Sequence, residues 1–254
     1  MTPFPLGLFD SMKKLARRLQ KLSALVSIPG YRKALRFGVA AAIEHEHLLR
    51  GISCKTVIDI GANRGQFALV SRHSFPDARI ISFEPLPGPA KLFREVFSGD
   101  GAVVLHESAI GPMAETRMMH VSACDDSSSL FPISSRQANL FPGTHEAGTM
   151  EVRVAPLETF LKTEEISSPA LLKLDVQGFE HEALIGCESM LPHFDRVYCE
   201  CSFVELYSGQ RLACEVIDWL SARGFCLTGV FNPAYDRHGQ AIQADFLFGR
   251  KARF

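Results

Sequence analysis

The chain has 254 residues, and its 46% hydrophobic content is enough for one large core. A formal net charge of -1 argues against nucleic acid as a partner. The seven cysteines lie mostly in apolar segments and form no C-x-x-C pair, which predicts reduced thiols and a cytoplasmic protein, and we expect neither a membrane span nor a signal peptide.

The first patterned stretch is basic. Residues 10–36 carry eight basic side chains and one acidic side chain. Apolar residues recur there at steps of three and four, which predicts an amphipathic helix that ends before Pro29. With a second helix predicted over residues 32–50, residues 1–50 form a helical extension ahead of one domain, residues 51–254. Three roles stay open for the basic face: a solvated surface, peripheral contact with the inner face of an anionic membrane, or a homodimer contact.

A buried strand followed by a glycine turn comes next, in the segment TVIDIGANRGQF, residues 56–67. Val57, Ile58 and Ile60 are typical of a strand that is covered on both faces. Gly61 and Gly65 permit a tight turn and a close approach of a ligand to the main chain. A strand, a glycine turn and a helix N-terminus together predict a pocket for a nucleoside-bearing cofactor.

The second predicted strand, residues 78–83, leads into an acidic residue. Glu84 lies 19 positions after Gly65. An acid at the tip of the second strand of a βαβ unit is placed to bind both hydroxyls of an adenosine ribose. A helix over residues 86–98 and a third strand over residues 102–110 follow, so the repeated βα steps predict a parallel, doubly wound α/β sheet.

The repeated βα pattern ends after residue 110. Residues 115–121 and 150–155 alternate apolar and polar side chains, which predicts two short antiparallel strands. The turn-rich segment between them, residues 122–148, is long enough to predict a lid or acceptor loop rather than a plain connection. The remaining predicted elements are a short helix (156–162), a central strand (170–174), a fifth strand (196–201), a helix (211–223) and a terminal hairpin (225–231 and 244–248).

Five segments are expected to meet at one crevice, because ligands of open α/β sheets bind beyond the carboxyl ends of the strands. The residues at or near those ends are Gly61, Glu84, Ala109, Asp175 and Glu200. An NAD-dependent oxidoreductase would use the same geometry. However, the turn lacks the G-x-G-x-x-G pattern, and no tyrosine has a lysine four positions later. The turn therefore suits a cofactor without pyrophosphate, such as S-adenosyl-L-methionine.

Four segments resemble the motifs of the FkbM family of S-adenosylmethionine-dependent methyltransferases. They are VIDIGANRGQF (57–67), SFEP (82–85), LLKLDVQGFEHEALIGCESML (171–191) and ECSFVELYSGQ (200–210). The resemblance covers about residues 55–210. It implies the Rossmann-like class I methyltransferase fold, a mostly parallel seven-stranded sheet with helices on both faces. It also implies methyl transfer to oxygen, commonly on sugars, glycolipids, polysaccharides or polyketide-type products, with S-adenosyl-L-homocysteine as the other product.

Residue roles follow from the same resemblance. Gly61, Ala62 and Asn63 would border the methionine moiety, Glu84 the ribose, and Asp175 the amino acid end or the methyl group. The full expected cofactor set is Asp59, Gly61, Ala62, Asn63, Gly65, Phe67, Glu84, Pro85, Ser108, Ala109 and Asp175. Ser108 and Ala109, which would border the adenine, are equally compatible with ordinary strand packing.

Methyl transfer to a sugar hydroxyl calls for in-line positioning and a general base. Asp175 is the first candidate base, followed by Glu200, Glu180 and His181. Glu180 could instead cap a helix, and His181 could lie at the surface. The candidate acceptor-binding residues are Ser128, Ser129, Tyr207 and Gln210.

No residue pattern favours a metal site. Mg²⁺ held by Asp175 and Glu200 is possible but not favoured, because no aspartate pair or histidine accompanies them. The leading hypothesis is thus an O-methyltransferase that acts on a small-molecule or lipid-linked saccharide. The alternatives are an NAD-dependent Rossmann oxidoreductase and a catalytically inactive, membrane-associated scaffold.

Overall fold

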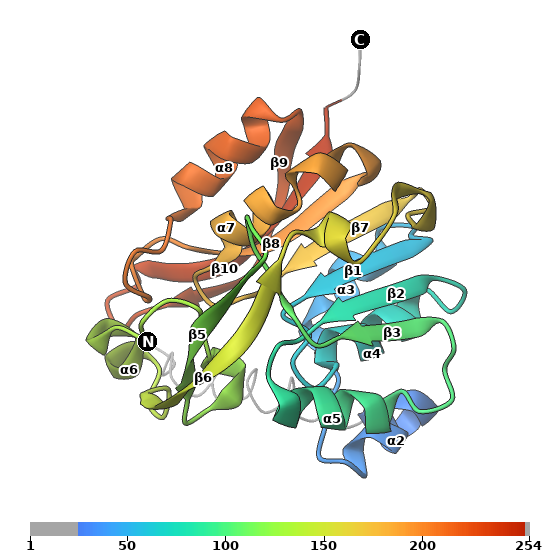
Figure 1. The fold of residues 1–254 in the computed structure, drawn as a ribbon, viewed down its shortest axis with the longest axis horizontal. Coiled ribbons are helices and arrows are strands. Elements are labelled where there is room, and N and C mark those ends of the chain that lie inside the picture. The colour runs from blue at the N-terminus through green and yellow to red at the C-terminus, as the bar shows by residue number, and fades with distance from the viewer. Residues whose placement is uncertain (1–24, 252–254) are drawn as a thin grey trace, which may run out of the picture.

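A computed structural model describes residues 25–251, and its centre is a seven-stranded sheet (Figure 1). The strand order is β3-β2-β1-β7-β8-β10-β9, so strand order reverses between β1 and β7. β10 runs antiparallel to both of its neighbours, and the other pairs are parallel. The strands are β1 (Thr56–Ile60), β2 (Arg79–Phe83), β3 (Val103–His106), β7 (Ala170–Leu174), β8 (Arg196–Ser202), β9 (Phe225–Tyr235) and β10 (Ala241–Arg250).

Helices cover both faces of this sheet, as a doubly wound topology predicts. On one face, side chains of α2 (Pro29–Leu35), α3 (Glu46–Arg50), α4 (Gln66–Ser74) and α5 (Pro87–Val96) share an apolar cluster with β1 and β2. On the other face, α7 (Glu180–Gly186) and α8 (Ala213–Ala222) join a second cluster. Because β1 and β7 are covered from both sides, every residue of these two strands is buried.

A second, three-stranded sheet has the order β4-β6-β5. β5 (Glu115–Ser122) and β6 (Glu146–Ala155) pair antiparallel, which confirms the two strands predicted from alternation. The segment between them contains a 3-10 turn (Asp125–Ser127) and the short helix α6 (Ser135–Leu140). Buried side chains of β5 and β6 belong to the cluster that also holds α7 and α8, so this sheet packs on the same face.

The predicted third strand, residues 102–110, is wrong as one element. β3 ends at His106, and Ala109–Ile110 form β4, which pairs parallel with β6 in the second sheet. The Ser108 hydroxyl contributes to this change of sheet, because it donates to the backbone oxygen of Arg153 on β6 at 3.1 Å. One predicted strand, whose apolar residues are interrupted by His106, Glu107 and Ser108, therefore serves two sheets.

The continuous helix predicted over residues 32–50 is also wrong. α2 ends at Leu35, Gly38 adopts a positive φ of 72°, and the chain turns helical again only at Ile43. The helix predicted within residues 156–162 is reduced to a 3-10 turn, Leu157–Thr159. Much of the basic helix predicted over residues 10–36 lies outside the described residues. None of the helices within residues 25–251 is long and apolar enough to cross a bilayer.

Candidate active site

The turn after β1 brings the tips of three strands together. Gly61 has a φ of 79°, and a Cβ atom at this position would lie 1.8 Å from the backbone oxygen of Asp175. The amides of Gly61 and Ala62 both donate to the backbone oxygen of Phe83 at 3.0 Å. A glycine is therefore required here by both conformation and space. The tip of β1 is joined directly to the tips of β2 and β7.

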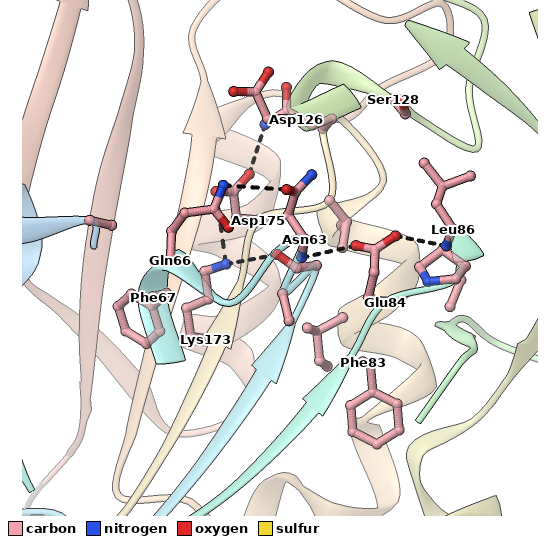
Figure 2. Close-up of a pocket in the computed structure, with 18 of the residues that line it drawn as sticks. Asn63, Gln66, Phe67, Phe83, Glu84, Leu86, Asp126, Ser128, Lys173 and Asp175 are labelled. Atoms are coloured by element: carbon pink, nitrogen blue, oxygen red, sulfur yellow. Dashed lines mark hydrogen bonds and ion pairs between the residues drawn. The ribbon is translucent and has the colours of Figure 1, made fainter. Parts of the chain in front are cut away.

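Glu84, at the tip of β2, is buried and held from two sides. Its carboxylate accepts hydrogen bonds from the backbone amides of Asn63 at 2.9 Å and of Leu86 at 2.7 Å. Figure 2 shows the side chain between these two amides, at the edge of the cavity. The two amide donors fix the orientation of this carboxylate. Glu84 is thus a preorganised hydrogen-bond acceptor for a ligand.

A cavity of about 330 Å³ lies beyond these strand tips. This volume is in the range of small-molecule sites. One part of its wall is apolar, from Phe83, Leu86, Ile110 and Met119, and another part is polar. The members of the expected cofactor set that line it are Gly61, Ala62, Asn63, Phe67, Glu84, Pro85, Ala109 and Asp175.

Three residues of the expected cofactor set are not among those lining this cavity. Asp59 is fully buried beneath it and lies 3.1 Å from Lys173 Nζ. Gly65, at a φ of 92°, caps α4 and packs against Phe93. Ser108 is 1% exposed, and its hydroxyl hydrogen-bonds the main chain. These three residues support the walls of the cavity from outside it.

Lys173 is the buried cation of the cavity floor. Its Nζ donates to the backbone oxygen of Gly61 at 3.2 Å and lies 3.1 Å from Asp59 Oδ1 and 3.8 Å from Asp175 Oδ2. Burial by itself would lower the pKa of Lys173, but the two carboxylates outweigh it and raise the pKa. Lys173 therefore stays charged and holds the β1 and β7 tips together.

Asp175 lies on a wall that the first cavity shares with a second cavity of about 260 Å³. Its side chain is 38% exposed. Gln177 Nε2 donates to Asp175 Oδ1 at 2.7 Å and to Glu200 Oε2 at 3.1 Å. Gln177 has a positive φ of 55°, a conformation that non-glycine residues seldom adopt. Asp175, Gln177 and Asp126 line both cavities.

The other candidate bases lie away from both cavities. Glu200 receives hydrogen bonds from Gln177 and Gln243, and its burial, with nearby Asp175 and Asp245, raises its pKa well above the usual value. Glu180 Oε1 accepts from the amides of Val176 and Gly178 at 3.0 and 3.1 Å. His181 packs edge-on against Trp219 of α8, with ring centres 5.9 Å apart.

The candidate acceptor residues are similarly divided. Ser128 lines the first cavity, where its hydroxyl also accepts from the Ser122 amide. The Ser129 hydroxyl donates to the Gln177 backbone oxygen at 2.6 Å. Tyr207 is 2% exposed, with its hydroxyl 2.8 Å from Gln177 Oε1. Gln210 Oε1 accepts from the amides of Leu206 and Tyr207. Ser129 and Tyr207 thus contact Gln177, and Gln210 secures the loop that carries Tyr207.

Sequence reasoning missed several residues of the site. Lys173 could have been found, since a lysine inside the apolar run ALLKL must have a buried partner. His45 had no such signal. It lines the first cavity, and its Nδ1 lies 2.9 Å from the Tyr198 hydroxyl and 3.6 Å from Asp245. Burial lowers the pKa of His45, so the neutral ring is favoured.

The described residues contain no group of three or more histidine, cysteine, aspartate or glutamate side chains arranged to hold a metal ion. Asp175 and Glu200, the pair considered but not favoured for Mg²⁺, share the side-chain amide of Gln177 as a donor. In the described structure, these two carboxylates accept hydrogen bonds from side-chain amides.

The order of the main sheet, with its antiparallel β10, and a fixed acid at the tip of β2 define the class I, Rossmann-like methyltransferases. Residues 59–227 match the model of the Methyltransferase FkbM domain. The chain belongs to this family of S-adenosylmethionine-dependent methyltransferases.

Two curated relatives are methyltransferases by name. The 2-O-methyltransferase NoeI of Sinorhizobium fredii is 28% identical over 170 residues, which cover 65% of this chain and 70% of NoeI. Methyltransferase 1 of Beauveria bassiana is 27% identical over 157 residues, which cover 56% of this chain and 61% of that protein. The crystal structure of precorrin-6y C5,15-methyltransferase from Geobacter metallireducens matches with a TM-score of 0.47 and 11% identity, over 85% of this chain and 95% of that one.

The residues around the first cavity fit the family's cofactor. Glu84 offers a fixed carboxylate to a diol, and the apolar wall offers a surface to a base. Gln66 also lines the cavity, and its buried Oε1 has no hydrogen-bond partner in the described structure. An unpaired buried acceptor of this kind calls for a donor from a ligand or water.

Proposed function

We propose that the protein transfers the methyl group of S-adenosylmethionine to a hydroxyl of a sugar or glycan acceptor. The observation that carries the proposal is the position of Asp175, whose partly exposed carboxylate lies on the wall common to the two cavities. A group at this wall can contact a cofactor in the first cavity and an acceptor in the second. The name of NoeI, a 2-O-methyltransferase, supports oxygen as the acceptor atom.

Residues of the first cavity would hold the cofactor, which supplies an electrophilic methyl group on a sulfonium. Glu84 would accept hydrogen bonds from the ribose hydroxyls, because the Asn63 and Leu86 amides fix its carboxylate. The turn at Gly61 and Ala62 would border the methionine moiety. Phe83, Leu86 and Ile110 provide the apolar surface for the adenine.

Asp175 is the general base in this proposal. A neutral sugar hydroxyl is a weak nucleophile, so removal of its proton as the new O–C bond forms should contribute about 10²- to 10⁴-fold to the rate. Lys173 and Gln177 hold the Asp175 carboxylate in place. Glu200 is a poorer base, because its raised pKa favours the protonated form and it does not line either cavity.

The first experiment measures cofactor binding and turnover separately. Isothermal titration with S-adenosylhomocysteine should give binding in wild type and in Asp175→Asn. Labelled-methyl transfer to a panel of sugars should fall at least about 100-fold in Asp175→Asn. Asp218→Asn, an exposed aspartate of α8, is the matched control and should keep full activity. Folded protein that binds no S-adenosylhomocysteine would overturn the proposal.

The two alternatives make different predictions in the same experiment. A nicotinamide-dependent oxidoreductase would bind NAD and not S-adenosylhomocysteine. A catalytically inactive scaffold would bind S-adenosylhomocysteine and methylate no acceptor. Both are rejected if a labelled methyl group reaches any member of the sugar panel in an Asp175-dependent way.

A lipid-linked acceptor is the finer form of this proposal, and it depends on the basic residues 10–36. Peripheral contact with anionic lipid is worth about 1 kcal/mol per basic residue near the surface. Association with vesicles of anionic lipid should therefore be lost when residues 1–30 are deleted. Light scattering on the same two proteins tests the homodimer, and unchanged vesicle association would reject the membrane role.

A further inference from the structure

The second cavity is built from different parts of the chain than the first. One wall comes from residues 122–148, through Asp126, Ser127, Gln137, Phe141 and Thr144. The rest of the lining comes from Asp175 and Gln177 after β7 and from Gln243 on β10. Since the two cavities share Asp126, Asp175 and Gln177, a group in the second cavity can reach the first at that wall.

The charge of this cavity is one-sided. Two of its lining residues are aspartates, Asp126 and Asp175, and none of the described residues that line it is a lysine or arginine. Asp175 Oδ2 lies 3.8 Å from Lys173 Nζ, which lines the first cavity, so the described lining of the second cavity itself offers no cation to a carboxylate or phosphate on a ligand. The remaining polar lining consists of hydroxyl and amide side chains. Such a surface suits an uncharged ligand with many hydroxyl groups.

Three glutamines line the cavity, and two of them are engaged within the protein. Gln177 Nε2 donates to Asp175 and Glu200, and its Oε1 accepts from the Tyr207 hydroxyl. Gln243 Nε2 donates to Glu200 Oε1 at 2.7 Å. These bonds hold the two amides and explain their presence without a ligand.

Gln137 is different. It lies on α6, where its backbone amide donates to the Ser134 hydroxyl that caps this helix. The residue is 3% exposed, and its Oε1 has no hydrogen-bond partner in the described structure. A buried carbonyl oxygen without a partner costs stability, so a glutamine at this position calls for a function. The unpaired Oε1 of Gln137 is a suitable acceptor for a hydrogen bond from a ligand hydroxyl group.

We propose that the second cavity binds an uncharged, polyhydroxylated ring of the methyl acceptor, and that Gln137 Oε1 accepts a hydrogen bond from one of its hydroxyls. This inference rests on the proposed function, because it assumes that the ring presents a further hydroxyl to Asp175. Acidic sugars and sugar phosphates bind this position more weakly, because two aspartates and, among the described residues, no lysine or arginine line it. Gln137 is thereby a specificity-determining residue contributed by the segment 122–148.

The test uses the full chain saturated with S-adenosylhomocysteine, so that cofactor binding is established first and separately. Ligand-observed NMR measures the affinity of methyl glycosides of uncharged hexoses and deoxyhexoses, with methyl glucuronide as the acidic member. Uncharged glycosides should bind, and the glucuronide should bind at least about tenfold more weakly. Gln137→Met, which keeps the side-chain volume, should weaken the best glycoside about five- to tenfold, the effect of one neutral hydrogen bond.

Thermal unfolding distinguishes this role from a structural one. If Gln137 serves a ligand, Gln137→Met removes an unpaired buried oxygen and leaves the melting temperature of the ligand-free protein unchanged or higher. Gln240→Met, at an exposed glutamine, is the matched control for glycoside binding. The proposal is overturned if no glycoside of the panel binds, if the glucuronide binds equally well, or if Gln137→Met lowers the melting temperature without affecting glycoside binding. Absent cofactor binding would instead reject the proposed function itself.

Discussion

The two cavities differ in how the chain builds them. The first is formed largely at the tips of β1, β2 and β7, whose positions are set by pairing within the main sheet. The second depends on residues 122–148 and on β10, which meet only in the folded protein. Changes at the first cavity should therefore disturb the fold and cofactor binding together. Changes at the second should alter acceptor recognition with little effect on the fold.

The largest effect is expected from Gly61→Ala. The added Cβ atom would overlap the Asp175 backbone oxygen, at 1.8 Å, and would adopt an unfavourable φ of 79°. We expect a loss of more than about 4 kcal/mol in the free energy of unfolding, with no S-adenosylhomocysteine binding. Gly99→Ala has a similar φ of 89° but open space around it, and should cost only about 1–2 kcal/mol. Urea unfolding measures both variants. If Gly61→Ala and Gly99→Ala lowered the free energy of unfolding equally, the close contact between the tips of β1 and β7 would not explain the loss.

Lys173→Met should have the next largest effect. It leaves the fully buried Asp59 carboxylate without its cation, which typically costs about 3–5 kcal/mol. Arg79→Met, which breaks the exposed Arg79–Glu165 pair, should cost less than about 1 kcal/mol. Urea unfolding at pH 7 measures both. Adding Asp59→Asn to Lys173→Met should restore part of the stability, and failure to restore it would argue against charge burial as the cause.

Much of the first cavity could be predicted from sequence because its signals are local. The apolar runs of β1 and β7, the glycine turn and the spacing of Glu84 each lie within a few residues of the site that they form. Sequence reasoning missed the end of the third strand at His106, although the polar residues Glu107 and Ser108 interrupt its apolar residues. The choice between two sheets depends on β6, whose Val154 pairs with Ala109 from 45 positions along the chain.

The second cavity could not be predicted in this way. Its glutamines, Gln137, Gln177 and Gln243, are separated by long stretches of chain and share no motif. Glu200 was expected in the crevice because it lies near the carboxyl end of a strand, but it makes hydrogen bonds with Gln177 and Gln243 and lines neither cavity. Strand-end position thus predicts the neighbourhood of a side chain. Its direction depends on partners from other segments.

The pH dependence of Glu180→Gln tests the segment at Val176 and Gly178, whose backbone amides donate to the Glu180 carboxylate. Burial raises the pKa of Glu180 from 4.5 to about 7, so between these values the folded chain holds a proton that the unfolded chain has released. The contribution of Glu180 to the free energy of unfolding of the wild type therefore falls as the pH rises from 4.5 to about 7, by up to about 3 kcal/mol. Glutamine does not titrate and keeps an acceptor for the Val176 and Gly178 amides.

The stability of Glu180→Gln relative to wild type should therefore increase from pH 4.5 to pH 7 and then stay constant. Urea unfolding of both proteins across this range measures the difference. Glu151→Gln, at an exposed position on β6, is the control and should show no such trend. A difference between wild type and Glu180→Gln that does not change with pH would mean that Glu180 is not held protonated by the fold.

The smallest effect is expected from Tyr207→Phe, which acts through Gln177 on the wall that the two cavities share. The Tyr207 hydroxyl lies 2.8 Å from Gln177 Oε1 and orients the amide that holds Asp175. Removing it should lower kcat/KM for the acceptor about three- to tenfold, the effect of one hydrogen bond, and leave the Kd for S-adenosylhomocysteine unchanged. Tyr235→Phe, at a tyrosine that is 61% exposed, should change neither value. If Tyr207→Phe raised the Kd for S-adenosylhomocysteine by the same factor as it lowered kcat/KM, cofactor binding and acceptor recognition would depend on the same wall. The two cavities would then not act independently.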